Sequence, residues 1–136
     1  MTLTPLPIRL HPGDDLRRAL ERTFHAQDGT AAFVVAGIGS LSTTRLRFAG
    51  ADDPLVIDGA VEILTLSGTI TEVGSHLHMT VADAQGRVSG GHASYGCIVR
   101  TTAEVLVAAL SGWHFGRAID ATTGYEELAI RRVPST

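Results

Sequence analysis

The sequence predicts a single α/β domain of the α+β type, with one main helix near the N-terminus and strands through most of the rest of the chain. The length of 136 residues suits one domain with one hydrophobic core. A single segment near the N-terminus carries apolar residues at helical spacing. From Ala31 onward, short apolar or alternating runs are separated by glycines and polar turns, which is typical of strands. We therefore expect one domain over residues 1–136.

The helix is expected between two polar boundaries. Pro12-Gly13-Asp14-Asp15 follows a short predicted strand at Ile8-Arg9-Leu10 and supplies an acidic N-terminal cap. Asp28-Gly29 supplies the turn that ends the helix. The residues expected to face the core recur at helical spacing and are Leu16, Ala19, Leu20 and Phe24.

The remaining segments are expected to form strands. They comprise residues 32–36, 44–48, 56–59, 61–68, 98–101, 104–110, 113–119 and 128–131, with a histidine-rich hairpin between the fourth and the fifth. Gly37-Ile38-Gly39 and Ser40 separate the first two strands, and we interpret this glycine pair as a turn or a bulge. Periodicity leaves residues 104–110 open between helix and strand, and the valines and neighbouring strands favour a strand.

Composition limits the classes of function. The net charge is −3 and all eleven basic residues are arginine, without the basic stripe that supplies much of the affinity of nucleic-acid-binding proteins. The arginines form only small groups, such as Arg45 with Arg47. Hydrophobic residues make up 44% and charged residues 18% of the chain, which fits either a subunit interface or a well-filled core.

The only cysteine, Cys97, excludes an intrachain disulfide. It lies in an apolar run, which predicts a buried and unreactive thiol. No window reaches the roughly 18 apolar residues of a membrane span, and the first residues lack the basic and apolar regions of a signal peptide. We therefore expect a cytoplasmic protein that has no membrane partner.

Three of the six histidines surround one predicted turn. His76 and His78 lie two residues apart in a predicted strand, so both project from the same face, roughly 7 Å apart along the chain. If Ala84-Gln85-Gly86 is a three-residue hairpin loop with Gly86 in the left-handed conformation, Asp83 pairs with Arg87. His78 then falls opposite His92, and all three rings share one face.

This inference depends on the length of the loop. A two-residue or four-residue loop would shift the pairing and turn His92 away from the other two rings. With the three-residue loop, His76, His78 and His92 form a candidate three-nitrogen metal site, which leaves a fourth position for water or substrate. Such a site permits zinc-dependent hydrolase or lyase chemistry. The alternative is a metal that only steadies the hairpin or a subunit contact.

Two carboxylates are candidates for catalytic acid or base. Glu62 is expected on the same strand face as Leu64 and Leu66, where a carboxylate needs a partner or a raised pKa. A structural salt bridge is the simpler interpretation of Glu62. Glu104 is the second candidate, and His114 is a candidate to support the histidine site. None of these roles follows from residue spacing.

Several segments, read in order, resemble the PPC domain, a family named for plants and prokaryotes. The resemblance covers a core of about residues 8–130 and rests on motifs distributed along the chain. They are Leu10-His11-Pro12-Gly13-Asp14-Asp15-Leu16, Glu62-Ile63-Leu64-Thr65-Leu66-Ser67-Gly68, His76-Leu77-His78, residues 83–86, Gly90-Gly91-His92 and Thr123-Gly124-Tyr125.

The resemblance implies a mainly antiparallel sheet, a homotrimer and a divalent metal, zinc, held by His76, His78 and His92. It also implies a stand-alone prokaryotic type, because plant members join the domain to AT-hooks of the form Arg-Gly-Arg-Pro, and this sequence contains none. The family's DNA-binding label leaves a regulatory or scaffolding module, associated with DNA through a partner or through Arg45 and Arg47, as an alternative.

Overall fold

The computed structural model describes residues 2–134. Within this range the chain forms eight strands and one helix. In order they are β1 (Leu3–Leu10), α1 (Leu16–His25), β2 (Ala31–Arg47), β3 (Leu55–Thr71), β4 (Gly74–Ala82), β5 (Val88–Ala93), β6 (Ile98–Leu110), β7 (Trp113–Ile119) and β8 (Glu126–Arg132). The mixed α and β class and the single N-terminal helix agree with the expectation from the sequence.

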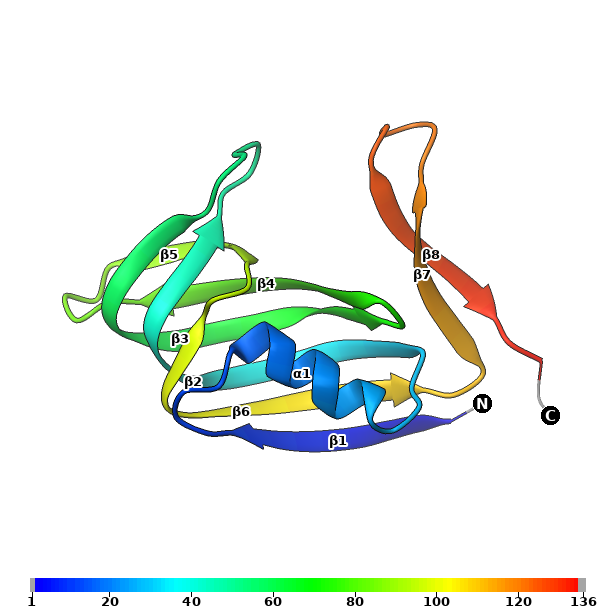
Figure 1. Cartoon of the computed structure of the whole chain (residues 1–136), viewed down its shortest axis with the longest axis horizontal. Coiled ribbons are helices and arrows are strands. Elements are labelled where there is room, and N and C mark those ends of the chain that lie inside the picture. Colours follow the sequence, from blue (N-terminus) through cyan, green and yellow to red (C-terminus); the bar gives the residue numbers. More distant parts are fainter. Residues whose placement is uncertain (1, 135–136) are drawn as a thin grey trace.

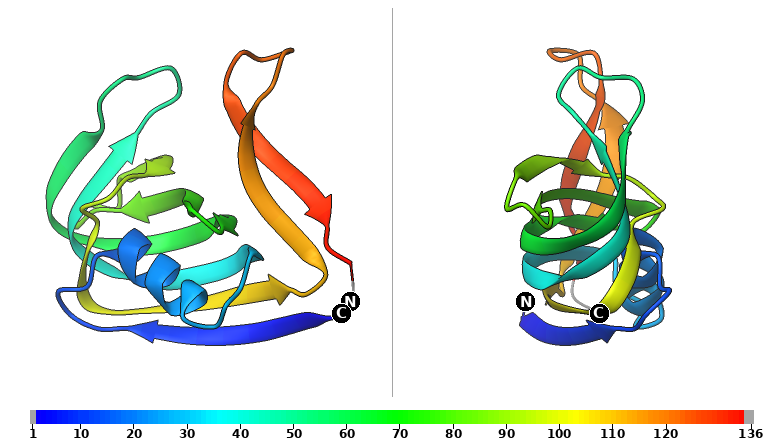
Figure 2. Two further views of the ribbon diagram at one scale, coloured as in Figure 1. Left: turned by 45° about the vertical axis from the view of Figure 1, so that its right-hand side comes forward. Right: turned by 90° about the vertical axis from the view of Figure 1, so that its left-hand side faces the viewer.

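Six of the strands form one antiparallel sheet in the order β1-β6-β2-β3-β4-β5. β5 also pairs with the end of β2, where Leu46 lies opposite Ala93 and Arg47 opposite His92. The sheet therefore curls until its last strand meets a central one, and its strong curvature is visible in Figures 1 and 2. This closure brings β5 against a strand more than forty residues earlier in the chain.

β2, β3 and β6 are longer than the sequence pattern predicts. Residues 32–36 and 44–48, expected as two strands, belong to the single strand β2, and β3 and β6 each unite two expected strands in the same way. Of the two glycines that suggested a break, Gly37 is paired in regular register with β6, and Gly39 borders a register shift. At Gly39 the backbone φ is +152°, and a side chain there would meet the carbonyl oxygen of Thr102 at 2.5 Å. β2 bends at Gly39 and continues, because glycine allows both the positive φ and the close contact with the neighbouring backbone.

α1 packs one apolar face onto the sheet. Asp15 caps its N-terminus by accepting a hydrogen bond from the Arg18 N–H at 3.1 Å. The four residues expected on the inner face are all buried, namely Leu16, Ala19, Leu20 and Phe24. His25, at the C-terminal end, contacts the carbonyl oxygen of Thr71 through Nε2 at 2.7 Å, which ties the helix to β3.

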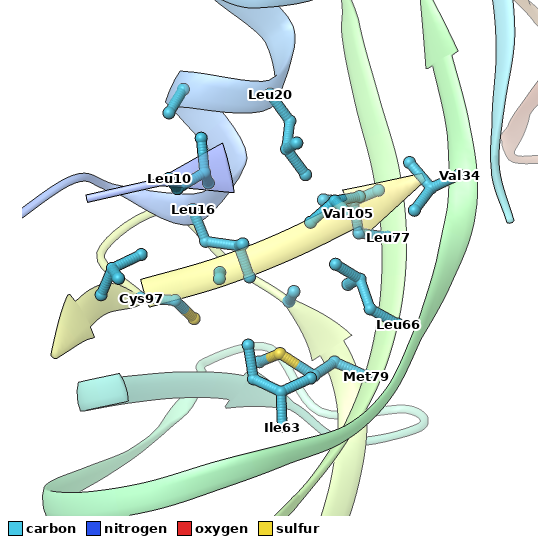
Figure 3. Close-up of a cluster of buried hydrophobic side chains, with 14 of the residues drawn as sticks. Leu10, Leu16, Leu20, Val34, Ile63, Leu66, Leu77, Met79, Cys97 and Val105 are labelled. Atoms are coloured by element: carbon cyan, nitrogen blue, oxygen red, sulfur yellow. The ribbon is translucent and has the colours of Figure 1, made fainter. Parts of the chain in front are cut away.

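The core lies between α1 and the concave face of the sheet, where leucines of the helix meet Leu66 of β3 and Leu77 of β4 (Figure 3). Cys97 is also fully buried there. Leu77 and Met79 are buried and alternate with His76 and His78 along β4. The core therefore fixes the face of β4 from which these histidines project.

β7 and β8 form a separate two-stranded hairpin that stands away from the sheet (Figure 1). Its base is anchored by Phe115, which is buried, stacks edge-on against Phe33, and donates its N–H to the Thr30 carbonyl at 2.9 Å. Toward its far end, Ile119 and Tyr125 are exposed. Among the described residues, no helix is long and apolar enough to cross a membrane.

Candidate metal centre

The β4–β5 hairpin has the register that the sequence predicts. Gly86 has a φ of +78°, and the Asp83 N–H donates to the Arg87 carbonyl at 2.9 Å. His78 lies directly opposite His92. The three-residue loop is therefore confirmed, and the two-residue and four-residue alternatives are excluded.

The side chain of Asp83 holds this turn. Its Oδ1 accepts hydrogen bonds from the N–H groups of Gln85 and Arg87, both at 2.9 Å, and its Oδ2 accepts from Arg87 Nε at 2.9 Å. These bonds, led by those from Arg87, lower the pKa of the Asp83 carboxyl. Because each bond favours this loop length, Asp83 contributes to the register that places His92.

The three predicted histidines converge. His76 Nε2 lies 3.0 Å from His92 Nδ1 and 3.2 Å from His78 Nε2. One ligand nitrogen from each of the three residues lies within 4.8 Å of the others, and no further His, Cys, Asp or Glu in residues 2–134 joins the group. His78 is exposed and His92 half-buried, so the cluster is open on one side.

This arrangement matches the needs of a metal ion better than those of a hydrogen-bonded cluster. A ring nitrogen carries either one proton or one lone pair. In a hydrogen-bonded cluster, the single proton or lone pair of His76 Nε2 would have to serve two neighbouring nitrogens. Tetrahedral zinc with Zn–N bonds of about 2.0–2.1 Å places its ligand nitrogens about 3.3–3.4 Å apart. The observed separations of 3.0 and 3.2 Å are close to that spacing.

Burial and nearby positive charges favour the neutral form of His76 and His92. Burial, followed by the charges of neighbouring imidazoles and arginines, lowers the pKa of His76 from 6.5 to about 4. Burial and then Arg47 lower the pKa of His92. Neutral imidazole is the form that binds metal.

A sequence model of the Plants and Prokaryotes Conserved (PCC) domain, which is the PPC domain, matches residues 1–111. The chain belongs to this family. The chain is 45% identical over 132 residues to a protein named "Bifunctional protein GlmU" from Synechococcus sp. (strain JA-3-3Ab), a match that covers 97% of this chain and 21% of that protein. The chain thus spans about a fifth of the length of this curated relative.

Solved structures share the fold. A hypothetical protein from Salmonella cholerae-suis is 35% identical, with a TM-score of 0.93 and coverage of 96% of this chain and 95% of that one. A metal-containing protein from Archaeoglobus fulgidus is 26% identical, with a TM-score of 0.76 and 93% coverage of both chains. A protein from Ralstonia eutropha, described as a candidate DNA-binding protein, is 25% identical, with a TM-score of 0.76 and coverage of 90% and 89%.

The position of His92 depends on a close approach between the backbones of β5 and β2. A side chain at Gly91 would meet the carbonyl oxygen of Arg47 at 2.7 Å, so glycine lets β5 lie directly against β2. Gly91 therefore has a packing role beside His92. The same approach sets Arg47 opposite His92, a neighbour that sequence spacing did not reveal.

A cavity of about 780 Å³ opens beside His76 and His92. Arg17 of α1, Arg47 of β2 and Arg117 of β7 contribute to its wall. Its carboxylates are Asp52, Glu126 and Glu127. Only Arg47 among these groups was a candidate from the sequence, as a DNA contact. No local pattern marks the others as site residues, because they come from distant segments that only the folded chain brings together.

Glu62, Glu104 and His114 lie elsewhere, and none of them lines this cavity. Glu62 is exposed, whereas Leu66 is buried, because a bulge between Ile63 and Thr65 changes the alternation of faces in β3. Glu62 therefore shares its exposed face with Leu64, as expected, but not with Leu66. Glu104 accepts a hydrogen bond from Thr102 Oγ1 at 2.8 Å, and His114 Nε2 lies 2.6 Å from Glu72 Oε2.

Proposed function

We propose that this PCC domain binds a divalent metal ion, zinc, through His76, His78 and His92. The observation that carries the proposal is the convergence of three ring nitrogens from one hairpin, with the spacing of metal ligands. The similar Archaeoglobus fulgidus protein is described as metal-containing. Imidazole ligands suit zinc, and three protein nitrogens are typical of a site with an open position.

The adjoining cavity favours a chemical role for the metal over a purely structural one. When bound with three imidazole ligands, zinc can polarise a carbonyl or lower the pKa of water to about 7, which suits a hydrolase or lyase. The carboxylates that a ligand in the cavity would meet are Asp52, Glu126 and Glu127. We propose these, in place of Glu62 and Glu104, as the candidate proton-transfer groups.

Elemental mass spectrometry of the purified, untagged protein tests the metal site. We expect about one zinc ion per chain in the wild type and a loss of most of this metal in a His76→Ala, His78→Ala double variant. His11→Ala serves as the control, because His11 is exposed and lies outside the cluster. Equal metal content in the double variant and the control, or none in the wild type after incubation with zinc, would overturn the proposal.

We further propose that the protein is a homotrimer and that it is cytoplasmic. Exposed apolar side chains on three neighbouring strands support an assembly, among them Ile38 of β2, Leu64 of β3 and Leu106 of β6. A free and buried Cys97 fits a reducing compartment. Cell fractionation tests the location.

DNA binding is the second candidate, favoured by the description of the similar Ralstonia eutropha protein. Direct binding to the phosphate backbone would weaken steeply as salt rises. A gel-shift titration with duplex DNA distinguishes the two candidates. With a net charge of −3, we expect no binding even at about 50 mM salt, and salt-sensitive binding would favour the DNA-associated module instead.

A further inference from the structure

We propose that the cavity beside the histidines binds a small organic anion, a carboxylate or a phosphate, through the guanidinium groups of Arg47 and Arg117. The inference rests on the proposed function, because the same ligand would face the metal held by His76, His78 and His92. It adds the chemical class of that ligand and the two residues that recognise it.

Of the three arginines in the cavity wall, Arg17 is already neutralised. Its Nε lies 3.5 Å from Glu21 Oε1 and donates to Ser75 Oγ at 3.0 Å. Its guanidinium also stacks over the ring of Tyr95 at 4.1 Å. Glu21 further accepts hydrogen bonds from Tyr95 Oη at 2.8 and 3.0 Å and from Ser75 Oγ at 2.7 Å. Arg17 is therefore part of a rigid wall.

Arg47 and Arg117 have no such partner. Arg47 donates to the backbone carbonyl of Ala51 at 3.3 Å, and Arg117 donates to the backbone carbonyl of Glu126 at 2.8 Å. No salt bridge within residues 2–134 joins either guanidinium to a carboxylate. Each guanidinium has five N–H donors, so both keep donors and a full positive charge for a ligand.

The two arginines come from different parts of the fold. Arg47 is half-buried at the end of β2 and lies opposite His92, while Arg117 lies on the separate β7–β8 hairpin. Both line the one cavity that also holds His76 and His92.

The size and remaining charges of the cavity indicate a small ligand. Its volume of about 780 Å³ lies within the roughly 300–1,000 Å³ of small-molecule sites. Asp52, Glu126 and Glu127 also line it, and these carboxylates would repel an extended polyanion. A compact anion can contact the arginines and the open metal position together, because guanidinium binds carboxylate and phosphate in the same bidentate way.

Isothermal titration calorimetry at constant ionic strength tests the inference with two probes, inorganic phosphate and succinate. The proteins are wild type, Arg47→Gln, Arg117→Gln and the control Arg100→Gln, whose arginine is exposed on β6 outside the cavity. Each is measured with and without zinc, and the metal content of every sample is determined. The probe that binds with the higher affinity shows whether the site prefers phosphate or carboxylate.

We expect at least one probe to bind the wild type and Arg100→Gln alike. Each cavity variant should weaken that binding by about 10- to 100-fold while keeping its metal content and thermal midpoint. Arg117→Lys should recover part of the affinity, since it restores the charge but not the planar fork.

Failure of the two proposals gives different results. A wild type that holds zinc but binds neither probe, or an Arg100→Gln loss equal to that of the cavity variants, would overturn the anion site and leave the metal site intact. A wild type without metal would overturn the proposed function, and the zinc-free titrations would still decide the anion site, because the arginines do not depend on the metal.

Discussion

The sulfur of Cys97 is enclosed by the core and by the backbone of one neighbour. It accepts a hydrogen bond from the Arg45 N–H at 3.3 Å and donates toward the Arg45 carbonyl at 3.5 Å, with no exposed surface. Burial raises the pKa of the Cys97 thiol, because a thiolate would lose its hydration. The buried and free thiol expected from the apolar run is therefore confirmed.

The raised pKa of the Cys97 thiol predicts that the folded protein becomes less stable at alkaline pH. The thiol of the unfolded chain ionises above about pH 8.5, whereas the folded thiol keeps its proton to higher pH. The unfolded state then binds fewer protons, so the free energy of unfolding should fall as pH rises, by up to about 1.4 kcal/mol per pH unit. Urea unfolding of the wild type and of Cys97→Ala between about pH 7 and pH 10 measures this pH dependence. If the free energy of unfolding fell equally with pH in both proteins, the prediction would be contradicted.

At the scale of the element, the β4–β5 hairpin builds the candidate site through two independent restraints. The turn held by Asp83 sets His78 opposite His92. The contact of Gly91 with the backbone of Arg47 then fixes β5 against β2. The first restraint is local, whereas the second joins strands that are distant in the sequence.

Gly91→Ala should therefore weaken metal binding without removing a ligand. The new methyl group would lie 2.7 Å from the Arg47 carbonyl oxygen, so β5 must shift and carry His92 with it. We expect zinc affinity to fall by roughly 10-fold or more, as when the support of a ligand is disturbed. Competition with a chromogenic chelator measures the affinity.

Gly86→Ala provides a comparison in the same hairpin. Its added methyl group would meet nothing within 4 Å, so its cost would come from the left-handed backbone alone. An unchanged zinc affinity in Gly91→Ala, or a larger loss in Gly86→Ala, would show that the contact with β2 does not position His92.

At the scale of the molecule, the sheet leaves apolar side chains unpaired on its central strands. Val35 and Ile38 of β2 are 54% and 60% exposed, and Leu64 of β3 is 47% exposed. Neighbouring strands with several such residues favour burial against another subunit, in line with the proposed homotrimer.

Ile38→Glu should disrupt this assembly, because a carboxylate at an apolar contact must be desolvated. Light scattering coupled to size exclusion should give three times the mass of the single chain for the wild type and a lower mass for the variant. Val88→Glu is the matched control, since Val88 is also 60% exposed but lies on β5. A wild-type monomer, or equal effects of both changes, would refute the assembly on these strands.

The sequence alone determined the features that depend on short stretches of chain. Helical spacing and the acidic cap placed α1, and the turn chemistry of Asp83 and Gly86 set the register that unites the three histidines. These signals are local, because a helix and a tight hairpin are formed by residues that are close in sequence.

Only the tertiary structure decided the features that depend on long-range pairing. The expected short strands are joined into long, bulged strands, and a bulge in β3 separates the face of Leu66 from that of Glu62. The closure of β5 on β2 set Arg47 beside His92, and the β7–β8 hairpin added Arg117 to the same cavity. Such contacts join distant segments through backbone hydrogen bonds and packing, which no local periodicity encodes.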